Sequence, residues 1–229
     1  MKTEFHCHTN RSFDCEVMIE DRIHKYKELG FDKLYITDHD KNTPLRWTRF
    51  SDTSLEICSG IEISTYYGHI IVLDSRYVPP ITALWAIALW SKFSNAKIYI
   101  PHPCRPGTGF FKRCEERKPI SKYIQWFLSK VDIIEVWNPR DSNRERIQIN
   151  ESWLNEIKSC TYAIASDSHF NNDILESGCD LKGIPSHNKY VKNFFNEKFL
   201  ISNRNNISLY HFLRSGVYTF AYLLGYRPQ

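Results

Sequence analysis

Two histidines stand two residues apart near the start of this 229-residue sequence. His6 and His8 flank Cys7, and residues two apart on an extended chain project from one face, so both imidazoles can bind one ion. Neutral imidazole is a ligand for Zn, Mn, Fe and similar divalent ions. Cys7 is expected to point the other way, into the core. Because a single histidine is more often a surface or core residue, a metal site needs further ligands.

A second cluster, Thr37-Asp38-His39-Asp40, directly follows the apolar run 34–36. Polar side chains packed against a buried strand end are costly to desolvate unless a charge or a metal compensates. His39 is therefore a candidate ligand. Asp38 is a candidate catalytic residue that orients an imidazole, and capping of a backbone turn is the alternative.

Three further segments supply ligand types. Glu62 lies between two isoleucines in GIEIS, so its carboxylate projects alone from one face of a strand. A carboxylate can bridge two cations, which an imidazole cannot do through one nitrogen, and Glu62 is therefore the predicted bridging and catalytic group. His102 is held between two prolines, and Asp167 alternates with His169 in SDSH.

Elements that would position these residues follow from short β-branched runs. The predicted strands span Thr3–Phe5, Lys33–Ile36, Ile57–Ser59, His69–Leu73, Lys97–Ile100, Ile133–Val136 and Tyr162–Ala165. Amphipathic segments predict helices over 18–29, 120–129 and 150–159. This alternation predicts a mostly parallel α/β sheet, open or closed into a barrel, with functional groups at the carboxyl ends of its strands. The clusters follow their strands as this rule requires, except that His69 begins its strand.

Composition favours one soluble domain over residues 1–229. A net charge of +4 suits an anionic substrate but is too small to indicate DNA binding by itself. Seven cysteines without a CxxC pair indicate reduced thiols in a cytoplasmic protein. The N-terminus lacks the apolar run of a signal peptide, and the apolar stretch 81–90 is about half the length needed to span a membrane.

Together, HCHT, ITDHD, GIEIS, GHIIVL, PHP and SDSH resemble, in order across 6–169, the PHP (polymerase and histidinol phosphatase) family of metal-dependent phosphoesterases. IIEVWN at 133–138 and ISLYHFLRSGVYTF at 207–220 extend the likeness over nearly the whole chain. The resemblance implies a distorted (β/α)7 barrel with two or three divalent ions, of Mn, Fe or Zn.

The resemblance also implies how the ligands are shared among the metals. The ligands of the first metal would be His6, His8, Glu62 and Asp167. The second metal would share Glu62 and add His69 and His102. The third would use His39, His169 and an acidic residue after the first motif. Relatives have Ser-Asp-Gly there, whereas this chain has Ser12-Phe13-Asp14-Cys15, so Asp14 is assigned to the third metal.

The expected reaction is in-line attack of a metal-activated water on phosphorus. Arg105 and Arg140 are candidate phosphate-binding residues, Arg105 with a catalytic role, although either can be a surface arginine. The motif sequences are most similar to those of the PHP family branch that contains nucleoside bisphosphate phosphatases and short-RNA 5′–3′ exonucleases. A nucleotide, a short single-stranded nucleic acid or another small phosphate ester is thus the expected substrate, and histidinol phosphate and phosphotyrosine remain open. Rim aromatics such as Tyr66 and Phe110 would stack a base or simply pack.

Two other classes compete with this hypothesis. One is a non-catalytic PHP-like metal-binding module that acts as a partner subunit, although a degenerate module usually loses several ligands. The other is a hydrolase of the amidohydrolase type, in which a carboxylated lysine usually bridges the metals. Glu62 fills that role here.

Overall fold

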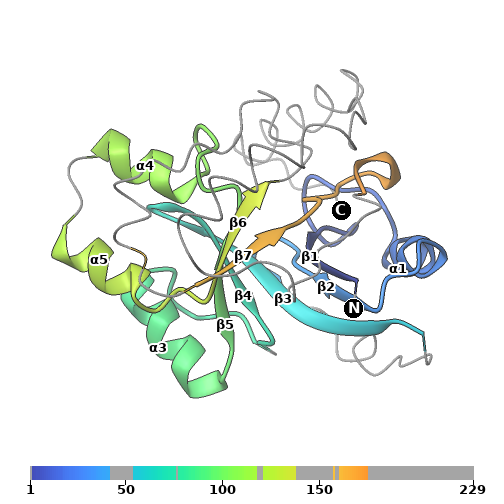
Figure 1. Ribbon diagram of the computed structural model, residues 1–229, viewed down its shortest axis with the longest axis horizontal. Coiled ribbons are helices and arrows are strands. Elements are labelled where there is room, and N and C mark those ends of the chain that lie inside the picture. Colours follow the sequence, from blue (N-terminus) through green and yellow to red (C-terminus); the bar gives the residue numbers. More distant parts are fainter. Residues whose placement is uncertain are drawn as a thin grey trace.

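The computed structural model describes residues 2–41, 54–75, 77–117, 121–137, 157 and 160–174 of the chain (Figure 1). The helix predicted at 150–159, the familiar segment at 207–220 and Arg140 lie outside the described residues, apart from Ile157. In the described part, no helix is long and apolar enough to cross a membrane.

Seven strands form at the predicted places. They are β1 (Thr3–Cys7), β2 (Lys33–Ile36), β3 (Glu56–Thr65), β4 (Gly68–Leu73), β5 (Lys97–Ile100), β6 (Ile133–Trp137) and β7 (Thr161–Ile164). The main difference is β3, which extends well beyond the predicted Ile57–Ser59, so that Glu62 lies inside the strand and not past its end. The extension exists because β3 continues into a hairpin with β4.

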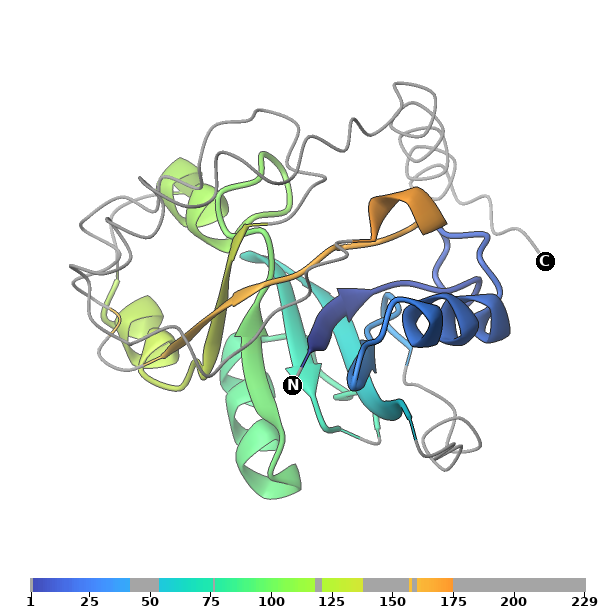
Figure 2. The same ribbon diagram turned by 45° about the vertical axis from the view of Figure 1, so that its right-hand side comes forward.

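The strands follow one another in the sheet in chain order, β1 to β7. Four neighbouring pairs are parallel, as predicted, whereas β4 runs antiparallel to both β3 and β5. Beyond β7, Ser168 pairs with Cys7 at the end of β1, and the His8 amide donates to the Ser168 carbonyl at 3.0 Å. The sheet thus curls into a nearly closed barrel, the predicted (β/α)7 class (Figure 2).

The reversed direction of β4 explains the exceptional place of His69 in the sequence. The first residues of an antiparallel strand lie at the same edge as the last residues of its parallel neighbours. Ser64 of β3 pairs with His69, so His69 enters the edge where the other clusters end their strands.

Helices cover the outside of the barrel. They are α1 (Ile19–Glu28), α3 (Leu84–Ser94), α4 (Phe110–Arg117) and α5 (Lys122–Leu128), followed late in the chain by the short 3-10 helix η1 (Asn171–Asp173). Their ends follow local chemistry, since Gly30 after α1 has φ +70° and the Ser121 side chain caps α5 by accepting from the Ile124 amide. Figure 1 shows α1 on one side of the sheet and α3, α4 and α5 on the other.

Two apolar clusters hold the strands in place. The smaller one packs buried residues of α1, such as Tyr26, on Leu34 and Ile36 of β2 and includes Cys7. The larger one joins β3–β7 to α3, α4 and α5. Cys7 therefore points into the core, as expected, and both clusters fix the strand ends that carry the polar residues.

Candidate metal centre

All nine side chains predicted as metal ligands converge at one end of the barrel. Every one is buried except His69, which is partly exposed. They fall into four overlapping groups in which the possible ligand atoms lie within 4.8 Å of one another. The groups are His8/Asp14/His39/His169, His6/His8/Asp167, His6/Glu62/His102 and His39/Glu62/His69.

The inner part of the centre has the spacing of ligands around a cation. The Nε2 atoms of His6 and His8 are 3.1 Å apart, and Glu62 Oε2 lies 3.2 and 3.1 Å from them. Asp167 Oδ1 lies 3.2 and 3.4 Å from the same two nitrogens. Two ligand atoms of a tetrahedral zinc ion are about 3.4 Å apart, from bond lengths near ~2.1 Å. These residues therefore fit a divalent ion in both chemistry and spacing.

Glu62 has its two carboxylate oxygens turned toward different histidines. Oε2 lies 3.1–3.2 Å from His6 and His8, whereas Oε1 lies 2.8 Å from His69 Nδ1 and 3.0 Å from His102 Nε2. This is the arrangement that a bridging carboxylate requires, with one oxygen for each of two neighbouring ions.

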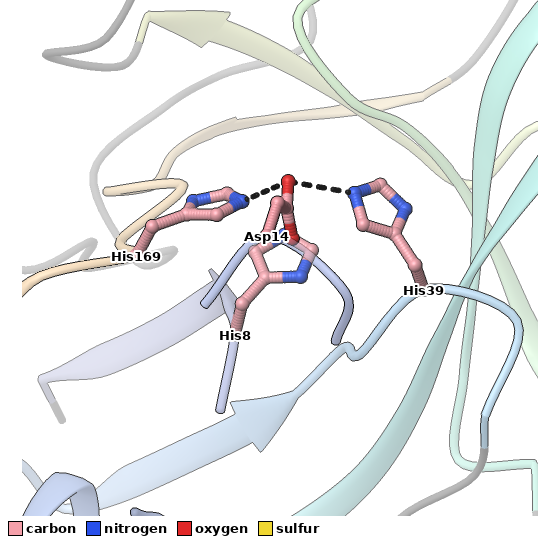
Figure 3. Close-up of side chains that lie close together, drawn as sticks. All are labelled: His8, Asp14, His39 and His169. Atoms are coloured by element: carbon pink, nitrogen blue, oxygen red, sulfur yellow. Dashed lines mark hydrogen bonds and ion pairs between the residues drawn. The ribbon is translucent and has the colours of Figure 1, made fainter. Parts of the chain in front are cut away.

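Asp14 lies in the third group despite the unusual sequence of its loop. Its Oδ2 atom is 2.8 Å from His169 Nε2 and 3.4 Å from His39 Nε2 (Figure 3). The His8 ring lies close by, with ring centroids 4.7 Å from His39 and 4.2 Å from His169. The inserted Phe13 stacks on His39 with a centroid distance of 4.9 Å. The loop thus accommodates Phe13 and still places a carboxylate among the histidines.

The histidines of the centre differ in the direction of their pKa shifts. Burial lowers the pKa of His6, but Asp167 and Glu62 outweigh it and raise that pKa well above the usual value. Burial likewise opposes the carboxylates around His39, whose pKa nevertheless rises to about 9. His69 differs, since burial dominates and lowers its pKa to about 4. Burial would raise the pKa of Glu62, yet the surrounding histidines hold it well below its usual range. The carboxylates of the centre therefore favour positive charge at His6 and His39.

Glu135 supports two of these histidines, a role that the sequence reasoning missed. It is fully buried and accepts from His6 Nδ1 at 2.9 Å, from the Tyr99 hydroxyl at 2.7 Å and from the His102 amide at 2.9 Å. Burial raises its pKa, but the His6 hydrogen bond reverses the shift and lowers it. By accepting from Nδ1, Glu135 leaves Nε2 of His6 as the ligand atom. The signal was present, because Glu135 stands among apolar residues in IIEVW as Glu62 does in GIEIS.

Glu4 forms a second buried support that was not predicted. Its carboxylate accepts from the His6 amide at 3.0 Å and from the Ser166 amide at 3.0 Å and hydroxyl at 2.6 Å. The Tyr26 hydroxyl donates to it at 3.1 Å. Burial raises the pKa of Glu4, with these hydrogen bonds opposing the shift. Glu4 ties the His6 strand to the segment that leads into Asp167.

Asp38, predicted as a candidate catalytic residue, lies behind the ligands and is outside the four groups. It accepts from the Thr9 amide at 2.7 Å, from the Thr9 hydroxyl at 2.8 Å and from Ser12 Oγ at 3.2 Å. Ser12 Oγ in turn lies 2.9 Å from His8 Nδ1. This placement fits the predicted orienting role, because Asp38 contacts His8 through Ser12 and lies outside the groups of possible ligand atoms.

Arg105 reaches the centre from the loop that follows β5. Its Nη1 donates to Asp167 Oδ2 at 2.7 Å, and its side chain is 23% exposed, so it lies at the edge of the centre. Among the rim aromatics, Tyr66 at the tip of the β3–β4 hairpin is 68% exposed, whereas Phe110 is buried in the core. The predicted stacking role therefore remains open for Tyr66 and does not apply to Phe110.

Two of the candidate ligands have a backbone conformation with positive φ. His102 has φ 28° and Asp167 has φ 47°, values that residues other than glycine rarely adopt. Such conformations cost about 1–3 kcal/mol each and persist where the surroundings impose them, often at functional sites. At Gly109, a Cβ atom would lie 2.7 Å from the His102 carbonyl oxygen, so only glycine lets the loop close around His102.

Several solved structures have a similar fold at low sequence identity. A protein from Bifidobacterium adolescentis assigned as a metal-dependent phosphoesterase is 14% identical with a TM-score of 0.52, covering 85% of this chain and 95% of its own. An amidohydrolase from Chromobacterium violaceum is 14% identical with a TM-score of 0.55, covering 83% and 100%. The lesion-specific endonuclease PfuEndoQ from Pyrococcus furiosus is 14% identical with a TM-score of 0.51, covering 75% and 49%.

These likenesses show the fold. The chain spans about half the length of the endonuclease and of a two-domain protein from Bacteroides vulgatus that it also matches. No curated protein sequence gives a significant match. The family model of the PHP domain, however, matches residues 4–176, which include every candidate ligand. The chain therefore belongs to the PHP domain family.

Proposed function

We propose that the protein is a metal-dependent phosphoester hydrolase that acts on a nucleotide or a short single-stranded nucleic acid. The observation that carries this proposal is the carboxylate of Glu62, whose two oxygens face separate sets of histidines at 2.8–3.2 Å. A bridging carboxylate between two neighbouring cation sites is the arrangement that two-metal phosphoester hydrolysis requires.

The residues present divide naturally among the ions. His6, His8 and Asp167 would hold one ion together with Glu62, and His69 and His102 would hold a second through the other Glu62 oxygen. Asp14, His39 and His169 would hold a third. Bound ions of this kind lower the pKa of a water molecule toward ~7 and stabilise the charge of the attacking and leaving oxygens.

The chain itself supplies position, charge balance and shielding from water. Glu135 and Asp38 fix the orientations of His6 and His8, as described above. Arg105 brings a guanidinium to the edge of the centre, where it can hold the non-bridging oxygens of a phosphate. Eight of the nine candidate ligands are buried, whereas His69 and Arg105 are partly exposed, so a substrate would approach the centre from their side.

An exposed aromatic residue at the edge of the centre supports a nucleotide or oligonucleotide as the substrate. Tyr66 extends its exposed ring from the hairpin that carries His69, and exposed aromatic rings stack nucleobases. The net charge of +4 favours an anionic ligand. Among the proteins of similar fold is an endonuclease Q solved with duplex DNA that contains an abasic lesion, at 12% identity and a TM-score of 0.51 over 74% of this chain.

A reconstitution experiment tests the proposal. Metal-free protein is supplied with Mn, Fe or Zn and assayed on p-nitrophenyl phosphate, bis(p-nitrophenyl) phosphate, nucleotides and short RNA and DNA. Glu62→Gln should abolish turnover and weaken metal binding, whereas Glu56→Gln, at the exposed start of the same strand, should change neither. Metal binding without turnover on any of these substrates would favour the non-catalytic module instead.

A further inference from the structure

Arg22 of α1 is a charged side chain in an unusual position. It is 0% exposed, and its partners are three backbone carbonyls and a thiol. None of the carboxylates that the structure describes forms an ion pair with it. A buried cation without a carboxylate is costly, and removing such an ion from water costs several kcal/mol. Its presence therefore calls for a specific reason.

The partners of Arg22 lie next to candidate ligands of the first and third ions and away from the histidines of the second. Nε donates to the carbonyl of His8 at 3.0 Å, and Nη2 donates to the carbonyl of Ser168 at 3.3 Å. Nη1 donates to the carbonyl of Phe170 at 3.3 Å, so the carbonyls on both sides of His169 are held. Nη2 also lies 3.7 Å from Sγ of Cys15, the residue after Asp14, and that thiol donates to the His169 carbonyl at 3.1 Å.

These contacts cross the seam of the barrel. His8 follows β1 and His169 follows β7, and a single parallel bridge, Cys7 to Ser168, joins the two segments in the described part of the chain. The planar guanidinium, with donors fixed in a fork, spans the remaining gap. None of these contacts of Arg22 reaches His69, which lies on β4, or His102, which follows β5.

We propose that Arg22 is the positioning residue of the ion sites at the seam of the barrel, setting the relative places of His8, Asp14 and His169 by holding the backbone around them. This inference rests on the proposed metal-dependent function. Loss of a staple of the fold alone would affect all ions alike. Loss of a positioning residue at the seam weakens binding of the third ion and, through His8, of the first, and it spares the second ion, which His69 and His102 hold together with Glu62.

Equilibrium measurements of metal affinity, which do not depend on catalytic activity, distinguish a positioning residue from a staple of the fold. Arg22→Gln and Arg22→Lys proteins are titrated with Zn and with Mn by calorimetry, and their metal content is measured after dialysis. Arg22→Gln should weaken binding of the first and third ions about 10- to 100-fold, the usual effect of removing an outer support, and leave the second ion unchanged, and Arg22→Lys should recover part of the loss. Asp14→Asn should weaken the third ion alone, and the Arg22→Gln/Asp14→Asn double variant should still leave the second ion unchanged.

One further variant is a control, and another replaces Arg22→Gln if that protein does not fold. Ile19→Ala removes buried apolar contacts from the same helix without touching a carbonyl or a support of the centre. It should lower thermal stability and leave all metal affinities unchanged. If Arg22→Gln does not fold, Cys15→Ala carries the test, because it removes the thiol contacts with Arg22 and with the His169 carbonyl, leaves the guanidinium in place, and should weaken the third ion about three- to tenfold.

The outcomes separate the inference from the proposed function. A wild-type protein that binds no ion contradicts the proposed function. A wild-type protein that binds its ions while Arg22→Gln, or Cys15→Ala in its place, binds them all with unchanged affinity overturns the inference alone. Equal weakening of every ion also overturns it, because Arg22 would then act as a general staple of the fold.

Discussion

Replacement of Glu135 by glutamine should lower the metal affinity of the centre, although the two side chains have nearly the same volume. The carboxylate accepts from His6 Nδ1 and Tyr99 through Oε2 and from the His102 amide through Oε1. A glutamine side chain has one oxygen and one NH2 group, so it cannot accept at both positions.

Either orientation of the new amide has a defined cost. If its oxygen faces His6, the NH2 group opposes the His102 amide, which leaves a buried donor unsatisfied at about 1–3 kcal/mol. If its NH2 group faces His6, Nδ1 must accept and the proton moves to Nε2, the atom directed at His8 and Glu62. Metal affinity should fall about 10- to 100-fold, which corresponds to about 1.4–2.7 kcal/mol.

Competition with a chromophoric chelator measures this affinity, and thermal unfolding of the metal-free protein measures the stability loss. Tyr99→Phe is the matched control, because it removes one donor to the same oxygen and leaves the Glu135–His6 pair intact. Its metal affinity should stay within about twofold of wild type, given the modest net value of one hydrogen bond. Wild-type affinity in Glu135→Gln would refute the reasoning.

Three further predictions follow from the centre. Binding of metal at neutral pH should release protons, because the pKa of His39 is about 9 and that of His6 is raised. Calorimetry in buffers of different ionisation enthalpy measures this release. Titrations at several pH values should show the metal affinity rising with pH up to about 9. For the same reason, the part of the metal-free stability that His39 contributes is complete below about pH 6.5 and lost as pH rises through about 9, which pH-dependent thermal unfolding measures. Gly109→Ala should lower the free energy of unfolding by about 1–3 kcal/mol or more, because its Cβ would meet backbone atoms of Arg105 and His102 at 2.5–2.7 Å. Gly107→Ala is the control in denaturant titration, because no atom of the described residues lies within 4 Å of its Cβ and only a strained φ of 82° must be accommodated.

Much of the centre was predictable because parallel strands end at one edge of a sheet. Alternation in His6-Cys7-His8 and in Asp167-Ser168-His169 directs ligand pairs to one face, and the isolated carboxylate of Glu62 has few other uses. The position of His69 was harder to interpret, since a strand pattern carries no direction. The signal was the short turn ending at Gly68, whose φ of 101° suits a tight hairpin.

The supporting residues were less accessible from sequence. Arg22 lies three residues after Ile19 and four before Tyr26, on the apolar face of α1, but a charged residue on such a face is usually assumed to extend its head into solvent. Its true partners are backbone carbonyls on two distant segments, which no sequence pattern marks. Asp38 was predicted to orient an imidazole, but its route to His8 through Ser12 could not be predicted, because the hydrogen bonds from Thr9 and Ser12 depend on the folded loop.

The central claim is that this centre hydrolyses phosphoesters with divalent ions held by its histidines and carboxylates. The most direct measurement is the hydrolysis rate of p-nitrophenyl phosphate and bis(p-nitrophenyl) phosphate, before and after exhaustive chelation and again after Mn, Fe or Zn is restored. We predict that hydrolysis is lost on chelation, returns with metal, and does not return in Glu62→Gln. Full activity in protein whose metal content is zero would contradict the account.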